Sequence, residues 1–200
     1  LLAVSLAVIL RYSLRIKGGW LGRLCVLISG LGYAIPGSVI AVGVLLSLGW
    51  LDRTVDNMTR QFFDVSTGLI FIGGIAGLVF AYLVRFLAVA LGAAGSAFEK
   101  ISPRLDDAAH VLGSGPMHRL RRIHLPLLST GIMTAGLLVF VDVMKELPAT
   151  LILRPFNYDT LAVRAYELAS DELLRESASA SLVIVLVGLL PVIVLSRSIG

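Results

Sequence analysis

Long apolar runs are the feature that most constrains the fold of this chain. Four segments carry few or no charges, and they cover residues 24–51, 68–92, 127–153 and 181–195. A helix needs about 20 residues to cross the roughly 30 Å core of a bilayer, and the first three segments are longer than that. Because lipid offers no partner to backbone N–H and C=O groups, such segments are helical. The sequence therefore predicts an all-α integral membrane protein.

Composition and the opening residues support the same class. Of the 200 residues, 57% are hydrophobic and 15% are charged, whereas soluble domains have about 25% charged residues. The chain opens with LLAVSLAVIL, followed by the basic stretch RYSLRIK. The apolar run is too short to span a bilayer, and a signal peptide carries its positive charge before such a run. We interpret it as the end of a further spanning helix, which gives about five spans in part of a longer protein.

Charges in the connecting loops predict the orientation in the membrane. Residues 11–23, 94–126 and 196–200 contain ten basic and three acidic residues, whereas residues 52–67 and 154–180 contain five basic and eight acidic residues. Cytoplasmic loops are enriched in Lys and Arg, so the first set and the C-terminus are expected in the cytoplasm. A net charge of +4 that sorts between loops in this way does not indicate a nucleic-acid partner.

The first membrane segment carries Pro36 and Gly37 near its middle. Proline removes a backbone donor and glycine loosens the helix. Such a break is tolerated at membrane depth where protein or a water-filled cavity satisfies the freed groups. The pair therefore indicates either a bend that lines a pathway through the membrane or a kink that serves packing.

The third membrane segment carries charges close to its end. Asp142, Lys145 and Glu146 follow the spacing i, i+3, i+4 and so share a helix face, with Pro148 just beyond them. We expect Lys145 to pair with both acids, either as an outer gate on a pathway through the membrane or as a structural ion cluster. Hard cations favour oxygen ligands, but the neighbouring lysine argues against direct metal ligation, so a metal site stays unknown. In the second segment, Arg85 is expected to extend to the membrane surface.

A polar stretch at residues 99–126 interrupts the apolar pattern. Ser102 and Pro103 are typical of a helix start, and the Gly-Ser-Gly sequence at 113–115 ends that helix. Pro116 can begin a second short helix, and Pro126 precedes the next membrane segment. One face of the first helix combines Leu105, Ala108, Ala109 and Leu112. The helix pair either lies on lipid headgroups or docks on a soluble partner, and the small alanines favour docking.

The polar stretch at residues 99–126 resembles a motif of a known family. It reads DAAHVLG, then nine residues, then IHLP. This is similar to the EAA loop of binding-protein-dependent ABC importer permeases: Glu-Ala-Ala, three residues, Gly, nine residues, Ile-x-Leu-Pro. We therefore name residues 99–126 the coupling loop. The residues that match the pattern are Asp107, Ala108, Ala109, Gly113, Ile123, Leu125 and Pro126, with Asp in place of Glu at 107. The resemblance implies a type I ABC importer permease-like helical bundle.

Two further stretches resemble the ferric-iron branch of that superfamily: GYAIPGSVIAVG at 32–43 and VFVDVMKELPATLILRPFNYDTLAVRAYELASDE at 139–172. The resemblance implies a single transmembrane permease domain over residues 1–200, corresponding to the C-terminal half of a longer permease. The implied activity is import of ferric iron from periplasm to cytoplasm. Thiamine, polyamines, phosphonates and sulfate stay open as substrates, because their permeases share the EAA loop.

The resemblance also implies the partners and the location. A cytoplasmic ABC ATPase dimer would grip the coupling loop, with Gly113 allowing the loop to turn and Ala108 and Ala109 allowing close packing. The chain has no G-x-x-x-x-G-K-S/T sequence, so ATP and Mg²⁺ are expected on that ATPase, and no cofactor or enzyme activity is expected here. A periplasmic substrate-binding protein and a second permease half complete the implied set, in a multi-pass protein of the bacterial inner membrane.

Other classes fit the sequence less well. A membrane hydrolase would use Ser114 near His110 and His118, but the G-x-S-x-G elbow is missing. A metal site from these histidines and His124 is disfavoured, because their spacings put no two on one helical face. A channel would not need a loop of the EAA type.

Overall fold

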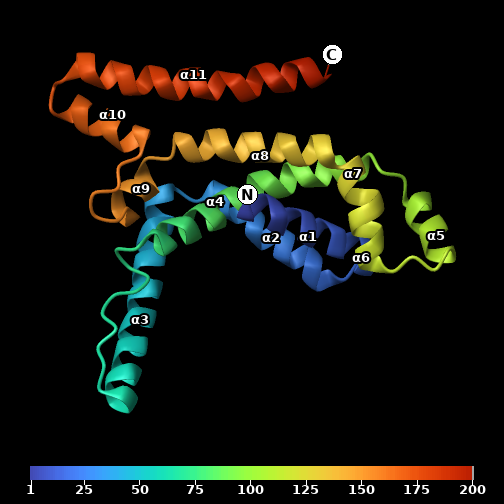
Figure 1. The fold of residues 1–200 in the computed structure, drawn as a ribbon, viewed down its shortest axis with the longest axis horizontal. Coiled ribbons are helices and arrows are strands. Elements are labelled where there is room, and N and C mark those ends of the chain that lie inside the picture. Colours follow the sequence, from blue (N-terminus) through green and yellow to red (C-terminus); the bar gives the residue numbers. More distant parts are fainter. Residues whose placement is uncertain (200) are drawn as a thin grey trace. The chain divides into compact units, whose positions relative to one another are not determined.

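The computed structural model describes residues 1–199, with side chains except those of residue 17 and residues 194–199, so Lys17 and Arg197 of the predicted cytoplasmic set lie outside the described side chains. Every regular element in this part of the chain is a helix (Figure 1). The helices are α1 (Leu2–Lys17), α2 (Trp20–Ala34), α3 (Gly37–Phe63), α4 (Ile75–Glu99), α5 (Pro103–Val111), α6 (Pro116–Arg119), the π-helix η1 (Leu120–His124), α7 (Leu125–Leu127), α8 (Ser129–Met144), α9 (Pro148–Leu153), α10 (Leu161–Ser170) and α11 (Leu174–Ile199). The expected all-α membrane class is confirmed.

Three helices in the described chain are long and apolar enough to cross a membrane: α3, α4 and α11 over Leu174–Ile193. A fourth span results if Pro116–Leu127 and α8, which meet at a bend of 73°, are taken together. The helices α1 and α2 are shorter, so length and composition give three to four spans where about five were expected.

Several expected segments have different boundaries in the structure. Residues 24–51 are two helices rather than one kinked span, because the chain leaves the helix at Ile35 and Pro36. The second segment becomes helical only at Ile75, and the third is interrupted between α8 and α9. Hydrophobic residues surround all three breaks, which is why an apolar run alone does not place them, although Lys145 and Glu146 lie within the break between α8 and α9.

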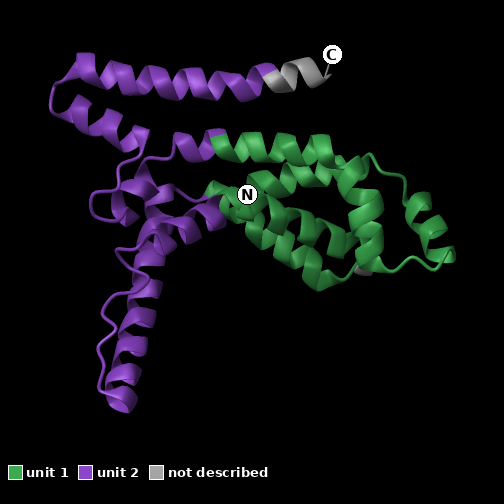
Figure 2. Cartoon of the chain, in the orientation of Figure 1, with its two compact units in different colours: residues 1–34, 86–140 green, residues 35–85, 141–200 purple. Residues whose placement is uncertain are grey.

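The chain forms two compact units, coloured separately in Figure 2. Unit 1 comprises residues 1–34 and 86–140 and contains the coupling loop. Helix α1 buries Ala3, Val4, Ala7 and Val8 at helical spacing, and the later part of α4 buries Leu87, Ala90, Leu91 and Ala94. The buried alanines among these residues permit close packing of the two helices. Arg11 of α1 also donates a hydrogen bond from Nε to Leu91 O of α4 at 3.0 Å.

Unit 2 comprises residues 35–85 and 141–200. Its core joins α3, the first part of α4 and α9, with Ile40, Ala41, Val44, Leu78, Ala81, Ala149 and Leu153 buried together. Apolar residues on α3 recur at a spacing that places them on one face, as expected for a helix that packs along one side.

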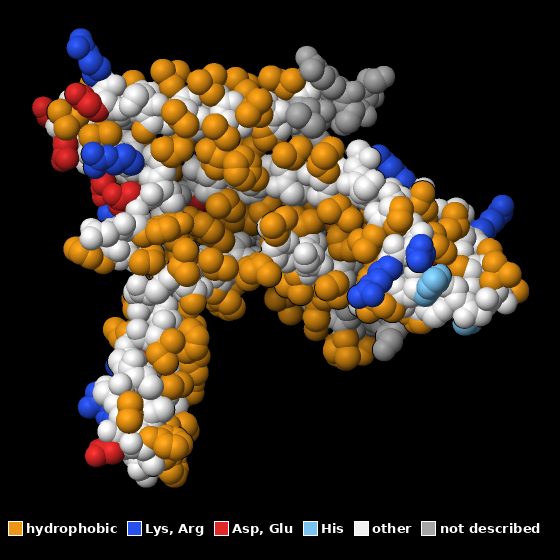
Figure 3. All heavy atoms as spheres, viewed as in Figure 1, with side chains coloured by type: hydrophobic (Ala, Val, Ile, Leu, Met, Phe, Trp, Pro, Cys, Tyr) orange, Lys and Arg blue, Asp and Glu red, His pale blue; other side chains and the backbone are white. Residues whose placement is uncertain are grey.

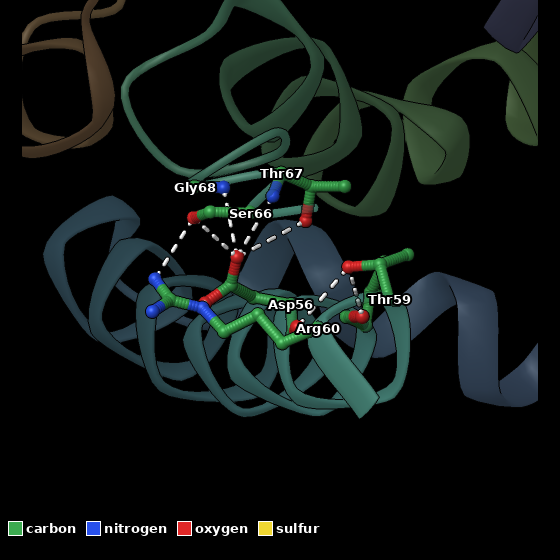
Figure 4. Close-up of polar contacts among 7 residues, drawn as sticks. Asp56, Thr59, Arg60, Ser66, Thr67 and Gly68 are labelled. Carbon is green, nitrogen blue, oxygen red and sulfur yellow. Dashed lines mark hydrogen bonds and ion pairs between the residues drawn. The ribbon is translucent and has the colours of Figure 1, made fainter. Parts of the chain in front are cut away.

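Two acids on α3 hold the loop that follows it. Asp52 is fully buried, and its carboxylate accepts hydrogen bonds from the backbone N–H groups of Ile70, Phe71 and Ile72 at 2.9–3.2 Å. One turn later, Asp56 pairs with Arg60 and accepts from Ser66, Thr67 and Gly68 (Figure 4). Backbone N–H groups of the non-helical segment 64–74 therefore hold this segment against α3 through Asp52 and Asp56.

A close helix contact in unit 1 provides a test of the packing. A Cβ atom at Gly131 of α8 would overlap the Cβ of Ala97 of α4, whereas Gly136 on the same helix has open space. Gly131→Ala should destabilise the protein by about 1–3 kcal/mol through overpacking. Gly136→Ala is the matched control and should stabilise the helix by up to about 1 kcal/mol. Thermal unfolding in detergent measures both, and equal melting temperatures would contradict the packing.

Candidate functional site

The coupling loop begins and ends as its sequence predicts. Helix α5 starts at Pro103, although the Ser102 side chain makes no capping hydrogen bond. Gly113 has φ +74°, a left-handed conformation that glycine adopts without steric cost. In this turn the Gly113 N–H bonds to His110 O and the Ser114 N–H to Ala109 O, which closes the helix.

The next helical stretch, from Pro116 to Leu127, contains a π-turn. Pro126 has no N–H and its ring would clash with the carbonyl of residue i−4 in a regular helix. The Leu125 N–H instead bonds to Leu120 O, five residues back, within η1. The wider turn accommodates the proline without breaking the helix.

The tip of the coupling loop is an exposed apolar surface. Val111 is 86% exposed, Leu112 is 85% exposed and Met117 is 60% exposed. Lys, Arg and His side chains lie around α5 and α6 in Figure 3. Large apolar side chains that a chain leaves uncovered among cationic groups are typical of a surface that another molecule covers.

The motif residues do not all lie on that surface. Asp107 and Ala108 are exposed, as are Gly113, Leu125 and Pro126, whereas Ile123 is half-buried. Ala109 is buried, so it packs inside unit 1. The expectation that Ala108 and Ala109 share a docking face is therefore wrong for Ala109, because α5 turns that position toward its own unit.

The inner side of α5 is fixed by an acid that the motif does not include. Asp106 Oδ2 accepts from Arg15 Nε at 2.6 Å, and Asp106 Oδ1 lies 2.7 Å from His124 Nε2. Since an ionised carboxylate can only accept, His124 Nε2 carries the proton. The His124 ring is fully buried. Asp106 thus joins α1, α5 and η1.

Arg15 and Tyr12, one turn apart on α1, make the remaining contacts. Arg15 donates from NH1 to Phe98 O at 2.8 Å and from NH2 to Ile101 O at 2.7 Å. The Tyr12 hydroxyl donates to Pro116 O at 2.5 Å, and its ring lies 5.1 Å from that of His124. Neither Arg15 nor Tyr12 stood out in the sequence, because their partners are far away along the chain.

The electrostatics of the cluster keep Asp106 ionised. Burial raises the pKa of the carboxyl, but hydrogen bonds from Arg15 and His124 outweigh burial, so the pKa lies below its ordinary value of 3.8. The contribution of a carboxyl with a lowered pKa is present above the ordinary value and is lost only as pH falls through the lowered one. The Asp106 carboxylate is therefore ionised at every pH near neutrality.

In unit 2, the structure brings together pathway residues that the sequence suggested separately. A Cβ atom at Gly37 would lie 2.5 Å from Glu146 Oε1 and 3.0 Å from Arg85 NH1. Arg85 Nε lies 3.0 Å from Glu146 Oε2, and Arg85 NH1 donates to Ile35 O at 3.0 Å. The expectation that Arg85 extends to the membrane surface is wrong, because its side chain is 80% buried against this helix break.

Glu146 also accepts a hydrogen bond at a second helix break, between α8 and α9. Its Oε1 accepts from the Ala149 N–H at the start of α9, where Pro148 is the first residue. Thr150 donates to the Glu146 carbonyl and is 2.5 Å from the Tyr82 hydroxyl. A buried ion pair thus lies where α3 begins and where α9 begins.

Lys145 and Asp142 form the expected pair, with Nζ and Oδ1 2.8 Å apart. Arg85 is a partner of Glu146 that the sequence reasoning missed. Among the residues that the structure describes, no group of three or more His, Cys, Asp or Glu side chains is placed to hold a metal ion.

The Arg85–Glu146 pair predicts a non-additive loss of stability. Arg85→Gln or Glu146→Gln alone leaves one buried charge without its counter-ion and should cost about 3–5 kcal/mol, whereas the double variant should cost less than either. Thermal unfolding of the four proteins in detergent forms a double-mutant cycle. Additive losses would show that the two side chains do not interact.

Comparison with known proteins gives the family. Residues 3–199 match the model described as "Binding-protein-dependent transport system inner membrane component". FbpB 2 of Haemophilus influenzae, an Fe(3+)-transport system permease protein, is 30% identical over 178 residues, which are 89% of this chain and 31% of that protein.

Two other relatives have different names. PhnV of Salmonella typhimurium, named as a 2-aminoethylphosphonate transport system permease protein, is 31% identical over 117 residues, which are 58% of this chain and 44% of that protein. The protein y4fN of Sinorhizobium fredii, named as an ABC transporter permease protein, is 29% identical over 148 residues, which are 74% of this chain and 24% of that protein. The chain spans less than half the length of each of these relatives. Because the family match runs through nearly every residue, the chain belongs to the inner-membrane components of binding-protein-dependent transport systems.

Proposed function

We propose that this chain is part of the permease of an ABC importer that moves ferric iron from periplasm to cytoplasm. Family membership supports the permease role, and the likeness to a ferric-iron permease over 89% of the chain supports the substrate. The relative named for 2-aminoethylphosphonate makes that compound the second candidate. Thiamine, polyamines and sulfate rank below both, because they rest on the shared loop alone.

The observation that carries the proposal is the contrast between the two sides of the coupling loop. Its inner side is held by a polar cluster around Asp106, whereas its outer side exposes Val111 and Leu112. A rigid base with an exposed apolar tip suits docking into a groove on another protein. A helix that lay on lipid would instead present a continuous apolar face, which the burial of Ala109 interrupts.

The partner at this tip is a cytoplasmic ABC ATPase dimer, which binds ATP and Mg²⁺ and supplies the energy. Closure of the dimer pulls on the coupling loop, and the spans respond by changing the side to which the pathway opens. A periplasmic substrate-binding protein delivers the substrate, and a second permease half completes the pathway. In this assignment, residues 1–200 form one permease domain with a cytoplasmic C-terminus.

The pathway in this proposal runs past the two helix breaks of unit 2. Gly37 and Glu146 meet there with Arg85, and Pro36, Pro148, Lys145 and Asp142 flank them. The guanidinium of Arg85 neutralises the Glu146 carboxylate, so this acid acts as a gate residue rather than as a ferric ligand. Intramembrane charges are costly and mark function in many transporters.

Uptake of radiolabelled ferric iron by iron-starved source cells, with and without the gene, tests the substrate. Loss of uptake that the wild-type gene restores is the expected result. Unchanged iron uptake together with lost growth on 2-aminoethylphosphonate as phosphorus source would move the substrate to the second candidate.

Docking of the ATPase has its own test. Leu112→Asp places a charge on the exposed tip and should weaken co-purification of the ATPase by about tenfold or more, as loss of an interface hot spot does. Ala109→Glu is a poor test, because Ala109 is buried and the variant would disturb the fold. Phe156→Asp, at a 94% exposed residue of unit 2, is the matched control and should leave ATPase binding unchanged. Equal ATPase recovery with the wild type, Leu112→Asp and Phe156→Asp would contradict docking at the tip.

A further inference from the structure

We propose that Arg15, Asp106 and His124, with Tyr12, form a latch that transmits movement of the coupling loop to helix α1. The latch is defined by these four side chains. It rests on the proposed function of the coupling loop, and it assigns positioning roles to residues outside the motif. Removing it should separate ATP hydrolysis from transport.

The first reason is that α1 holds the coupling loop at both ends. Arg15 contacts Asp106 in the first turn of α5 and the carbonyls of Phe98 and Ile101 just before α5. Tyr12 bonds to Pro116 O, the first residue after the Gly-Ser-Gly turn. Because Tyr12 and Arg15 lie one turn apart on α1, a single face of this helix contacts the chain at the start of α5 and again after the turn that follows α5.

The second reason is the density of polar contacts at Asp106. Its two carboxylate oxygens are used by different elements, Arg15 of α1 and His124 of η1. Its backbone carbonyl accepts from Arg119 NH1 at 3.3 Å. The Arg15 and Asp106 side chains are only 16% and 17% exposed, and charge-assisted hydrogen bonds shielded from water are stronger than exposed ones.

The third reason is that α5 has little else to hold it. It is a helix of 9 residues, and Ala109 is the buried residue on it. Its outer residues are exposed up to the tip at Val111 and Leu112. A pull on the tip therefore acts on α1 and η1 mainly through the Asp106 contacts, whereas without them α5 would move alone.

The test uses the assembled permease–ATPase complex in proteoliposomes, with ATP hydrolysis and substrate uptake measured together. Asp106→Ala and Arg15→Gln should keep ATPase binding but reduce the substrate moved per ATP on the order of tenfold, the usual size of coupling between two sites. Arg15→Lys keeps the charge but cannot reproduce the three planar donors of the guanidinium, so the substrate moved per ATP should fall by an intermediate amount. Glu99→Gln removes an exposed acid of the same loop and is the matched control.

A wild-type ratio of transport to hydrolysis in Asp106→Ala would overturn the latch. Loss of ATPase binding in Asp106→Ala would also overturn it, because the cluster would then shape the docking surface rather than transmit its movement. Failure of the wild-type chain to bind the ATPase would instead reject the proposed function.

Limited trypsin cleavage after the exposed Arg104 of the purified permease tests the latch independently of any ATPase. Asp106→Ala should accelerate this cleavage and Glu99→Gln should not. Equal cleavage rates in the wild type and Asp106→Ala would reject the latch even if the ATPase failed to bind.

Discussion

Backbone groups freed at a helix break need partners, and in an apolar layer only the protein can supply them. This constraint explains where the charged side chains of each unit lie. Arg85 donates to Ile35 O beside the Pro36 break, and Glu146 accepts from the N–H of Ala149 at the start of α9. In unit 1, Arg15 donates to carbonyls at the end of α4. These three charged side chains thus bond to the backbone where helices begin or end.

The same arrangement gives the coupling loop two different sides. Toward its own unit, the loop presents Asp106 to Arg15 and His124, and those contacts fix its position. Away from the unit, Val111 and Leu112 stay exposed. A partner that covers the tip would therefore bind a preformed surface, which lowers the entropy cost of association. The motif residues Asp107 and Ala108 lie on the exposed side, consistent with the proposed docking role.

Features that depend on local chemistry were predictable from the sequence. The helical class follows from apolar runs, the start of α5 follows from Pro103, and its end follows from Gly113. The breaks around Pro36 and between α8 and α9 were placed less well, because each lies inside a long hydrophobic segment, and a proline or a few charges in such a segment do not show whether the helix bends or ends. The long-range pairs were missed: Arg15 and Asp106 are 91 residues apart, and only the tertiary path of the chain brings them together. An acid doublet at 106–107 held one available signal, since successive helix positions point about 100° apart and one acid of such a pair can face the protein.

The central claim is that the tip of the coupling loop contacts protein rather than lipid. A benzophenone amino acid introduced in place of Leu112, activated by light in native membranes of the source cell, tests it most directly. The expected result is a covalent adduct with the ATPase subunit, with a yield that changes when ATP is added. Adducts formed with lipid alone would contradict the claim and return the loop to the membrane surface.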